Sequence, residues 1–385
     1  MTTIEALQIP RTLFGAGAIG QLAQELAVLG VRRPLLVTDR GIVAAGIAAR
    51  AMAACGDDAR AALFDAVTEN PLFADADAGA ACYQAQRCDG VVALGGGSAI
   101  DTAKLVALLA THPGRVADYA GVPGARIGPA APLVAIPTTA GTGSEASPSA
   151  GLHPDAGTPS VGISSRHLVP RLALLDPELT ATLPPRLSAA TGIDALSHCI
   201  EGCLSDRAQP LGKAIALDGI ARVARHLRRA ARPGADVQAR GEMLLAAFAG
   251  GVSIGMGLGP AHAIALSCSD QGFHHGVLSG IGLVATLDAT AASAPQRMAG
   301  IHEAMGLPSS VSTAQGVAML MRDLGLPTTL AELGYAAADV DALAQAAARS
   351  HFNLSAPHKP DAAQYAGFLR HSLGLGAAAA PELLS

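Results

Sequence analysis

Short apolar runs alternate with longer Ala-rich segments through the first half of the chain. Five runs, each bounded by turn residues or acids, predict buried strands at 34–39, 60–67, 90–98, 131–137 and 171–177. Helical spacing of apolar residues covers 41–56, 74–88 and 99–110. Strands separated by helices imply parallel pairing, right-handed crossovers and a sheet that is covered on both faces. The first half is therefore predicted to be an α/β domain.

The pattern changes after the Pro184–Pro185 pair. From Asp194 onward, long Ala/Leu-rich segments have helical spacing, and no convincing alternating strand follows. A chain of 385 residues also exceeds what one hydrophobic core normally supports. We therefore expect an α/β domain over 1–183 and an all-helical domain over 184–385, with ligands bound between them.

One uncharged stretch is long enough to cross a bilayer. Residues 243–269 contain no Asp, Glu, Lys or Arg. However, the stretch holds five glycines, Pro260 and His262, and neither a Lys/Arg cluster nor an aromatic belt flanks it. It predicts a buried helix that runs into a loop, and no membrane association.

Composition excludes nucleic acid as an expected partner and favours the cytoplasm. The net charge is −5, aromatic residues make up 3% of the chain, and there is no Trp. The chain has no excess of positive charge to attract phosphate backbones, and it has few aromatic side chains on which bases could stack. The start of the chain, MTTIEALQIPRTLFGAG, lacks the design of a signal peptide. The six cysteines form no CxxC pair, so we expect reduced, mostly buried thiols.

A glycine turn follows the strand predicted at 90–98. In VVALGGGSAIDTAK (91–104), Gly96 and Gly97 allow close backbone approach, and Ser98 offers a hydroxyl. The N–H groups that open the next helix could hold a pyrophosphate. The motif matches neither the GxGxxG fingerprint nor the P-loop, so a tight turn without a ligand is the alternative.

Two further polar features fit a dinucleotide. Asp39 ends the first predicted strand, where a carboxylate could accept hydrogen bonds from a ribose and repel a 2′-phosphate, which favours NAD over NADP. Capping of the next helix is the alternative role for Asp39. The loop AIPTTAGTGSEAS (135–147) places Thr138, Thr139 and Thr142 at a strand end. An ordinary hydroxyl-rich loop would look the same.

The second half carries a candidate metal site. Asp194 and His198 are four residues apart, so a helix would place both side chains on one face. His262 and His275 lie in HAIALSCSDQGFHHG (262–276). Without a metal, Asp194 and His198 could lie on a solvated helix face, and His262 could be a core histidine. However, one carboxylate and three imidazoles are costly to bury without partners. One carboxylate and three imidazoles suit Fe²⁺ or Zn²⁺, and an open coordination position would accept a substrate oxygen.

These motifs together resemble the iron-containing (group III) alcohol dehydrogenases over essentially the whole chain. GGGSAIDTAK, PTTAGTGSEAS, LDPELTATLP, GIDALSHCIEG and GPAHAIA…FHHG fall in the family's order and close to its spacings. The resemblance implies the dehydroquinate synthase-like architecture: an N-terminal dinucleotide-binding α/β domain, a helical C-terminal domain and a metal ion between them. It implies reversible hydride transfer between NAD(H) and a small alcohol, aldehyde or ketone, by a homodimer.

The resemblance also assigns residues. The metal ligands would be Asp194, His198, His262 and His275, the last because the family's final ligand precedes a glycine, here Gly276. The expected cofactor contacts include residues of the glycine turn and of the hydroxyl-rich loop. The full set is Asp39, Asn70, Gly96, Gly97, Ser98, Asp101, Thr138, Thr139, Thr142 and Leu179.

Three departures from the family pattern affect these expectations. Leu266 stands where many relatives carry a histidine credited with proton relay, so His274 is the candidate substitute. AGTPSVGISS (156–165) lacks the lysine that helps relatives to hold the cofactor. The span from His262 to His275 is also one residue shorter than the corresponding span in relatives of the family.

Four alternatives stay open. A maleylacetate reductase-like enzyme is one alternative, but such enzymes tend to lack acids at the positions of Asp101 and Asp194, and both acids are present here. A glycerol dehydrogenase-like enzyme would use fewer metal ligands, and the presence of His198 argues against it. A hydroxyacid–oxoacid transhydrogenase would hold NAD tightly and work without added cofactor. A catalytically silent NAD- or metal-binding protein is the alternative outside the enzymes, and Leu266 is its best support.

Overall fold

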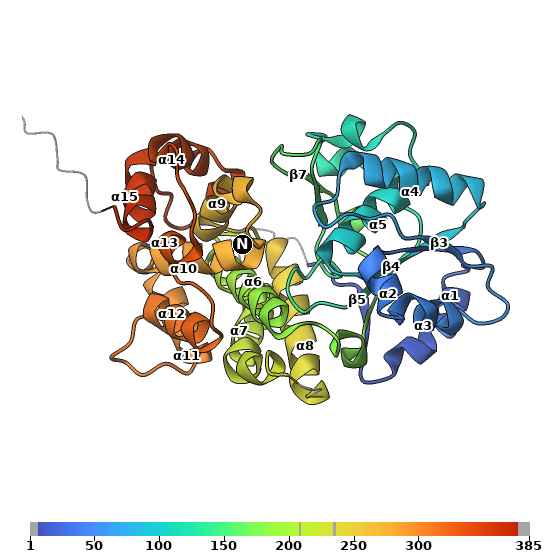
Figure 1. The fold of residues 1–385 in the computed structure, drawn as a ribbon, viewed down its shortest axis with the longest axis horizontal. Helices are drawn as coiled ribbons and strands as arrows, with labels where there is room; N and C mark the ends of the chain where they lie inside the picture. The colour runs from blue at the N-terminus through green and yellow to red at the C-terminus, as the bar shows by residue number, and fades with distance from the viewer. Residues whose placement is uncertain (1–6, 208, 234–235, 376–385) are drawn as a thin grey trace, which may run out of the picture.

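A computed structural model describes residues 7–207, 209–233 and 236–375. In Figure 1 the N-terminal part, on the right, contains a six-stranded parallel sheet, and the described C-terminal residues, on the left, are helical. The strand order is β1-β8-β5-β4-β2-β3. The predicted fold class, an α/β part followed by an all-α part, is confirmed. The exact domain boundary stays a prediction, although a long helix begins at Pro185.

All five predicted strands are present in the sheet. They are β2 (Pro34–Val37), β3 (Ala62–Phe64), β4 (Gly90–Gly95), β5 (Leu133–Pro137) and β8 (Leu172–Leu175). Two features were not predicted. The edge strand β1 (Arg11–Phe14) pairs with β8, and an antiparallel hairpin forms from β6 (Ser149–Leu152) and β7 (Val161–Ser164).

Alternate residues of the central strands bury opposite faces of the sheet. Leu36 and Val92 pack with α1 (Leu22–Val28) and α3 (Ile47–Ala54). Leu35 and Val91 face the other layer, where α4 (Phe73–Ala85) and α5 (Gly97–Leu109) lie. Because successive side chains of a strand point to opposite faces, continuous apolar runs give a sheet covered on both sides.

The helix predicted over 41–56 is divided. It forms α2 (Arg40–Ala44) and α3, because Gly46 between them has a φ of +76°. That left-handed conformation is open to glycine and interrupts the helical path. The helices predicted over 74–88 and 99–110 correspond to α4 and α5.

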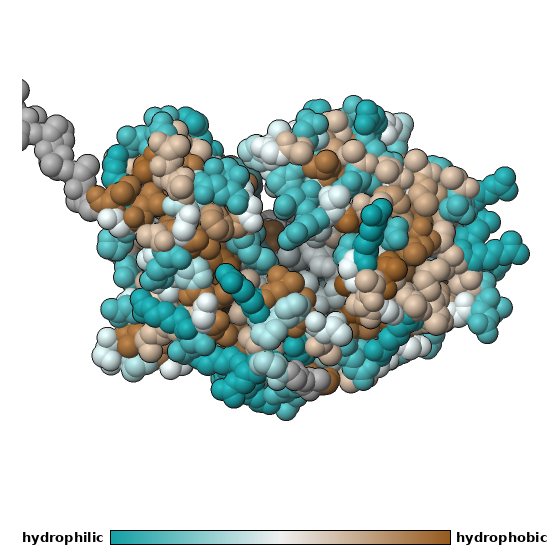
Figure 2. All heavy atoms as spheres, in the orientation of Figure 1, coloured by the Kyte–Doolittle hydropathy of each residue, from teal (hydrophilic) through white to brown (hydrophobic). Residues whose placement is uncertain are grey.

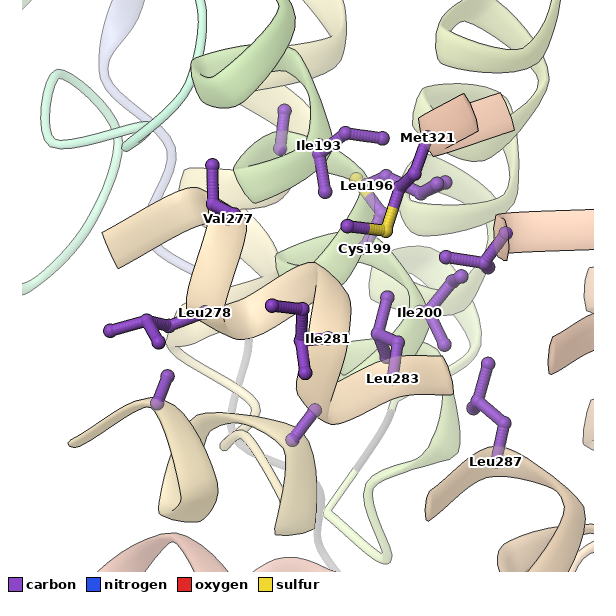
Figure 3. Packing of buried hydrophobic residues seen from close by; sticks show 14 of the residues in the cluster. Ile193, Leu196, Cys199, Ile200, Val277, Leu278, Ile281, Leu283, Leu287 and Met321 are labelled. Carbon is purple, nitrogen blue, oxygen red and sulfur yellow. The ribbon is translucent and has the colours of Figure 1, made fainter. Parts of the chain in front are cut away.

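The helical part buries a large apolar core around α6 and α10. Figure 3 shows Ile193 and Leu196 of α6 packed near Ile281 of α10 and Met321 of α12. Its helices are α6 (Pro185–Leu204), α7 (Pro210–Ala230), α8 (Val237–Ile254), α9 (Pro260–Ser267), α10 (His275–Ala291), α11 (Pro295–Ala304), α12 (Thr313–Asp323), α13 (Leu330–Leu333), α14 (Val340–Ala348) and α15 (Ala362–Ser372).

The uncharged stretch 243–269 comprises most of α8, a loop and α9, so the prediction of a buried helix that runs into a loop is correct. Within the described part of the chain, no helix combines the length and hydropathy needed to span a membrane. All six cysteines are free thiols, and four of them are buried.

Candidate metal and cofactor site

Helix α6 presents the first two predicted ligands from its buried face. Asp194 and His198 are 3% and 5% exposed. The Asp194 Oδ1 and His198 Nε2 atoms are 3.9 Å apart. The i, i+4 spacing therefore stacks a carboxylate and an imidazole on one helix face, as expected from the sequence.

Helices α9 and α10 bring the other two ligands to the same place. The His262 ring stacks on His198, with centroids 4.8 Å apart and planes at 18°. His275 is the first residue of α10, and its Nε2 is 3.9 Å from Asp194 Oδ1. The potential ligand atoms of Asp194, His262 and His275 all lie within 4.8 Å of one another. Three helices thus gather the four predicted residues into one cluster, here called the Asp–His cluster.

The buried donor atoms of this cluster fit a divalent cation. Asp194 Oδ1 and His262 Nε2 are buried and have no hydrogen-bond partner among the described residues. A buried polar atom without a partner costs about 1–3 kcal/mol. Coordination of one ion would offset that cost for both atoms at once. Mixed carboxylate and imidazole donors suit Fe²⁺ or Zn²⁺.

The electrostatics of the cluster favour the protonation states that metals bind. Burial lowers the pKa of His198 to about 4, so this ring is neutral near pH 7. Burial alone would raise the pKa of Asp194, but the surrounding imidazoles, led by His198 and His275, lower it more. A charged carboxylate and a neutral ring are the forms that coordinate.

Two residues beside the cluster were missed by the sequence analysis. Glu201 of α6 lies 2.6 Å from His262 Nδ1, through its Oε2. Phe352, in the short 3₁₀ helix η7 (His351–Ser355), meets the His262 ring edge-on at 5.7 Å. The position of Glu201, one helical turn after His198 in an apolar segment, was a usable signal. Nothing in the local sequence marks Phe352.

The glycine turn and the hydroxyl-rich loop contact each other at the carboxyl ends of β4 and β5. Gly96 caps α5, and a Cβ added to it would lie 3.3 Å from Thr139 Cγ2. A Cβ added to Gly97 would lie 2.6 Å from Thr142 Cγ2. Larger residues would push the two segments apart, so these glycines allow the close contact between turn and loop, and phosphate binding at the turn stays a prediction.

Asp39 combines its two expected positions. It caps α2 by accepting a 3.0 Å hydrogen bond from Ile42 N. Its other carboxylate oxygen would be 3.5 Å from a Cβ added to Gly95, so it also borders the glycine turn. The capping alternative is thus present in the structure, and it leaves Asp39 beside the glycine turn, where its contact with a ribose stays a prediction.

Asn70 and Ser98 also lie close to the turn. The Ser98 hydroxyl donates to the Glu69 carbonyl at 2.6 Å, which holds the residue before Asn70 against α5. Thr138 N donates to the Gly95 carbonyl at 2.9 Å, which fixes the start of the hydroxyl-rich loop.

Asp101 and Leu179 make contacts within the protein. The Asp101 carboxylate accepts from Gly151 N at 2.9 Å and lies 3.6 Å from Lys104 Nζ. Leu179 is 2% exposed and belongs to the core beneath the sheet. These contacts explain both residues structurally, and their cofactor roles stay predictions.

His274 caps α10 next to the Asp–His cluster. Its exposed ring accepts a hydrogen bond from Gly276 N through Nδ1 at 3.1 Å. A neutral ring that accepts at Nδ1 carries its proton on Nε2. Leu266, at the position where relatives carry a histidine, lies on α9 and is partly buried. Proton relay by His274 stays a prediction.

The glycine turn and the Asp–His cluster are joined through one loop. A Cβ on Gly141 of the hydroxyl-rich loop would meet Thr191 Cβ at 2.6 Å, and Thr191 lies on α6 one turn before Asp194. Figure 2 shows that the surface is hollowed between the helical part and the sheet part. A ligand on the glycine turn could therefore extend toward the cluster.

Comparisons with known proteins agree with this arrangement. A family model described as iron-containing alcohol dehydrogenase matches residues 10–177, and its C-terminal counterpart matches 188–373. The 4-hydroxybutyrate dehydrogenase of Cupriavidus necator is 41% identical over 370 residues, which covers 93% of this chain and 96% of that protein.

Solved structures share the whole fold. The crystal structure of a 1,3-propanediol oxidoreductase superposes with a TM-score of 0.91 at 30% identity, over 96% of this chain and 100% of that one. The sulfoacetaldehyde reductase of Bifidobacterium kashiwanohense, solved with NAD⁺, gives a TM-score of 0.89 at 26% identity, over 97% and 99%.

Proposed function

Because this chain belongs to the iron-containing alcohol dehydrogenase family and is an oxidoreductase, we propose that it interconverts a small primary alcohol and its aldehyde with NAD(H). The observation that carries the proposal is the Asp–His cluster, joined by the Gly141 loop to the glycine turn that would hold a dinucleotide. Asp194, His198, His262 and His275 would hold Fe²⁺, or Zn²⁺ in its place.

The chain's own residues supply position and electrostatics. A bound divalent ion supplies Lewis acidity toward the substrate oxygen, and NAD⁺ supplies the hydride acceptor. Gly96 and Gly97 leave room for the pyrophosphate, and Asp39 favours a free ribose over a 2′-phosphate. His274 Nε2 would exchange the hydroxyl proton with solvent. Enclosure between the two parts of the molecule would limit competing reactions with water.

A hydroxy acid is the substrate that we would test first. Two relatives are named for 4-hydroxybutyrate and 1,3-propanediol, and both of these compounds are primary alcohols. At 41% identity along nearly the full length, the 4-hydroxybutyrate relative gives the more specific expectation. We further expect a cytoplasmic homodimer without nucleic-acid or membrane partners.

The test is a turnover screen of the full-length protein loaded with Fe²⁺. NADH formation would be followed with 4-hydroxybutyrate, 1,3-propanediol and a panel of primary and secondary alcohols, and metal content would be measured in parallel. We expect turnover of a primary alcohol that needs the metal and is lost in His262→Ala. Turnover without added NAD would favour the transhydrogenase, and tight NADH and metal binding without any turnover would favour a silent binding protein.

A further inference from the structure

Glu201 connects the helix that carries two ligands to the helix that carries a third. It lies on α6, seven residues after Asp194 and three after His198, and is 4% exposed. Its Oε2 is 2.6 Å from His262 Nδ1 on α9. The Asp–His cluster therefore has a carboxylate directly behind one of its imidazoles.

The same carboxylate also caps α9. Glu201 accepts from three backbone N–H groups: Gly259 at 2.9 Å, Ala261 at 2.7 Å and His262 at 3.3 Å. A Cβ on Gly259 would lie 2.8 Å from Glu201 Oε1, so the close approach requires glycine at this point. Every backbone partner is a donor, and both Glu201 oxygens act as acceptors.

This arrangement fixes which nitrogen of His262 faces the cluster. Because both Glu201 oxygens already accept from backbone N–H groups, a carboxylate here would also accept from Nδ1, which places the ring proton on Nδ1 and the lone pair on Nε2. His262 Nε2 is the atom that is buried without a partner among the described residues. Carboxylates behind metal-binding histidines set the tautomer and raise the basicity of the ligand.

We propose that Glu201 is a positioning residue that holds His262 in the Nδ1–H tautomer, with Nε2 ready to bind the metal. The inference rests on the proposed function, since it assumes that the Asp–His cluster binds a divalent ion. The competing explanation is that Glu201 acts only as the cap of α9.

Asp176 offers a matched control for the capping role. It is fully buried and accepts from the backbone N–H groups of Gly17, Ile19 and Glu178 at 3.1–3.2 Å. No imidazole is among these partners, and the Arg50 guanidinium lies 3.8 Å from Asp176 Oδ2. Glu201→Gln and Asp176→Asn therefore make the same change from carboxylate to amide, with and without a histidine behind it.

The test measures metal affinity of the full-length protein. Metal-free samples of wild type, Glu201→Gln, Glu201→Met and Asp176→Asn would be titrated with Zn²⁺ against a chromophoric chelator, and the melting temperature of each metal-free sample would be recorded. We expect affinity to fall about tenfold in Glu201→Gln, which keeps one acceptor oxygen, and about 100-fold in Glu201→Met. Asp176→Asn should lower only the melting temperature.

The outcomes separate this inference from the proposed function. Wild-type affinity in Glu201→Met, or an equal loss in Asp176→Asn, would overturn the positioning role while the metal site stands. A wild-type protein that binds no metal would overturn both. Nitrogen-15 NMR of the histidines in the unmodified, metal-free protein needs no variant to fold. There, a His262 proton on Nδ1 supports the role, and one on Nε2 overturns it.

Discussion

His198 shows how burial prepares a side chain for coordination. In water an imidazole titrates near neutrality, but burial lowers the pKa of His198 to about 4. The ring then stays neutral through the physiological range and needs to release no proton when a cation binds. Asp194, whose pKa is lowered by the imidazoles around it, stays charged over the same range.

Glu145 gives a prediction about pH and stability. It is 1% exposed, and burial raises its pKa to about 7. The folded state therefore holds a proton that the unfolded state releases above its ordinary pKa of 4.5, so stability should fall as pH rises from about 4.5 to about 7. Glu145→Gln should remove this loss and exceed wild type at pH 8 by about 2–3 kcal/mol.

Urea unfolding at pH 5 and pH 8 checks this prediction. The exposed Glu303→Gln on α11 serves as the control and should behave as wild type at both values. A difference between Glu145→Gln and wild type that is the same at pH 5 and pH 8 would contradict the account.

His274 gives a prediction about proton transfer. Asn is a good helix cap, so His274→Asn should keep α10 and the metal content intact while it removes the ring. If His274 passes the hydroxyl proton, kcat should fall about 100-fold, with a changed pH profile. The measurement is a pH–rate profile of the metal-loaded variant, and an unchanged kcat and profile would rule His274 out.

At the scale of elements, close helix approach at glycines builds the cluster. A Cβ on Gly276 would lie 2.8 Å from Asp194 Cβ, and one on Gly250 would lie 3.1 Å from His198 Cβ. These two glycines let α10 and α8 approach α6 more closely than larger residues would allow. The precision of the site therefore depends on residues that carry no functional group.

Gly251 of α8 tests this packing. A Cβ there would overlap the carbonyl oxygen of Gly143 in the hydroxyl-rich loop. Gly251→Ala should therefore displace the loop, destabilise the protein by about 1–3 kcal/mol and raise the KM for NAD⁺. Thermal unfolding and NAD⁺ kinetics measure both effects.

Gly300→Ala is the matched control, since Gly300 also lies in a helix, α11. Its added Cβ would meet only Leu217, at 3.8 Å. Here we expect an unchanged KM and a stability equal to wild type or higher by about 0.5–1 kcal/mol. A wild-type KM and melting temperature in Gly251→Ala would show that the loop does not depend on this contact.

The sequence predicts elements with strong periodicity and misses weak ones. The central strands were predictable because they are buried on both faces and read as apolar runs. The strands β1, β6 and β7 are each four residues long and partly exposed, so they offer too few positions for an apolar pattern to stand out. The break at Gly46 depends on a positive φ, and the spacing of apolar residues does not indicate where a backbone adopts one.

The Asp–His cluster was predictable for a different reason. The i, i+4 spacing placed Asp194 beside His198, and the three histidines within 262–276, in a chain with few charged residues, pointed to His262 and His275. The position of Glu201 in the apolar segment after His198 indicated a buried acid, but its partner could not be predicted, because that depends on which residue α9 brings against it in the tertiary fold.

At the scale of the whole molecule, the fold joins two kinds of chemistry. In the proposed site, the ends of parallel strands would supply a glycine turn for phosphates, and packed helices would supply buried donors for a metal ion. The contact between Gly141 and Thr191 connects the two. The central claim is that Asp194, His198, His262 and His275 hold one divalent ion next to this junction.

Anomalous X-ray diffraction of crystals loaded with Fe²⁺, collected on both sides of the iron absorption edge, tests that claim most directly. We expect one strong peak, with Asp194 oxygen and the three histidine nitrogens at about 2.0–2.2 Å. Catalytically active, iron-loaded crystals that show no peak among these four side chains, or a peak elsewhere in the molecule, would contradict it.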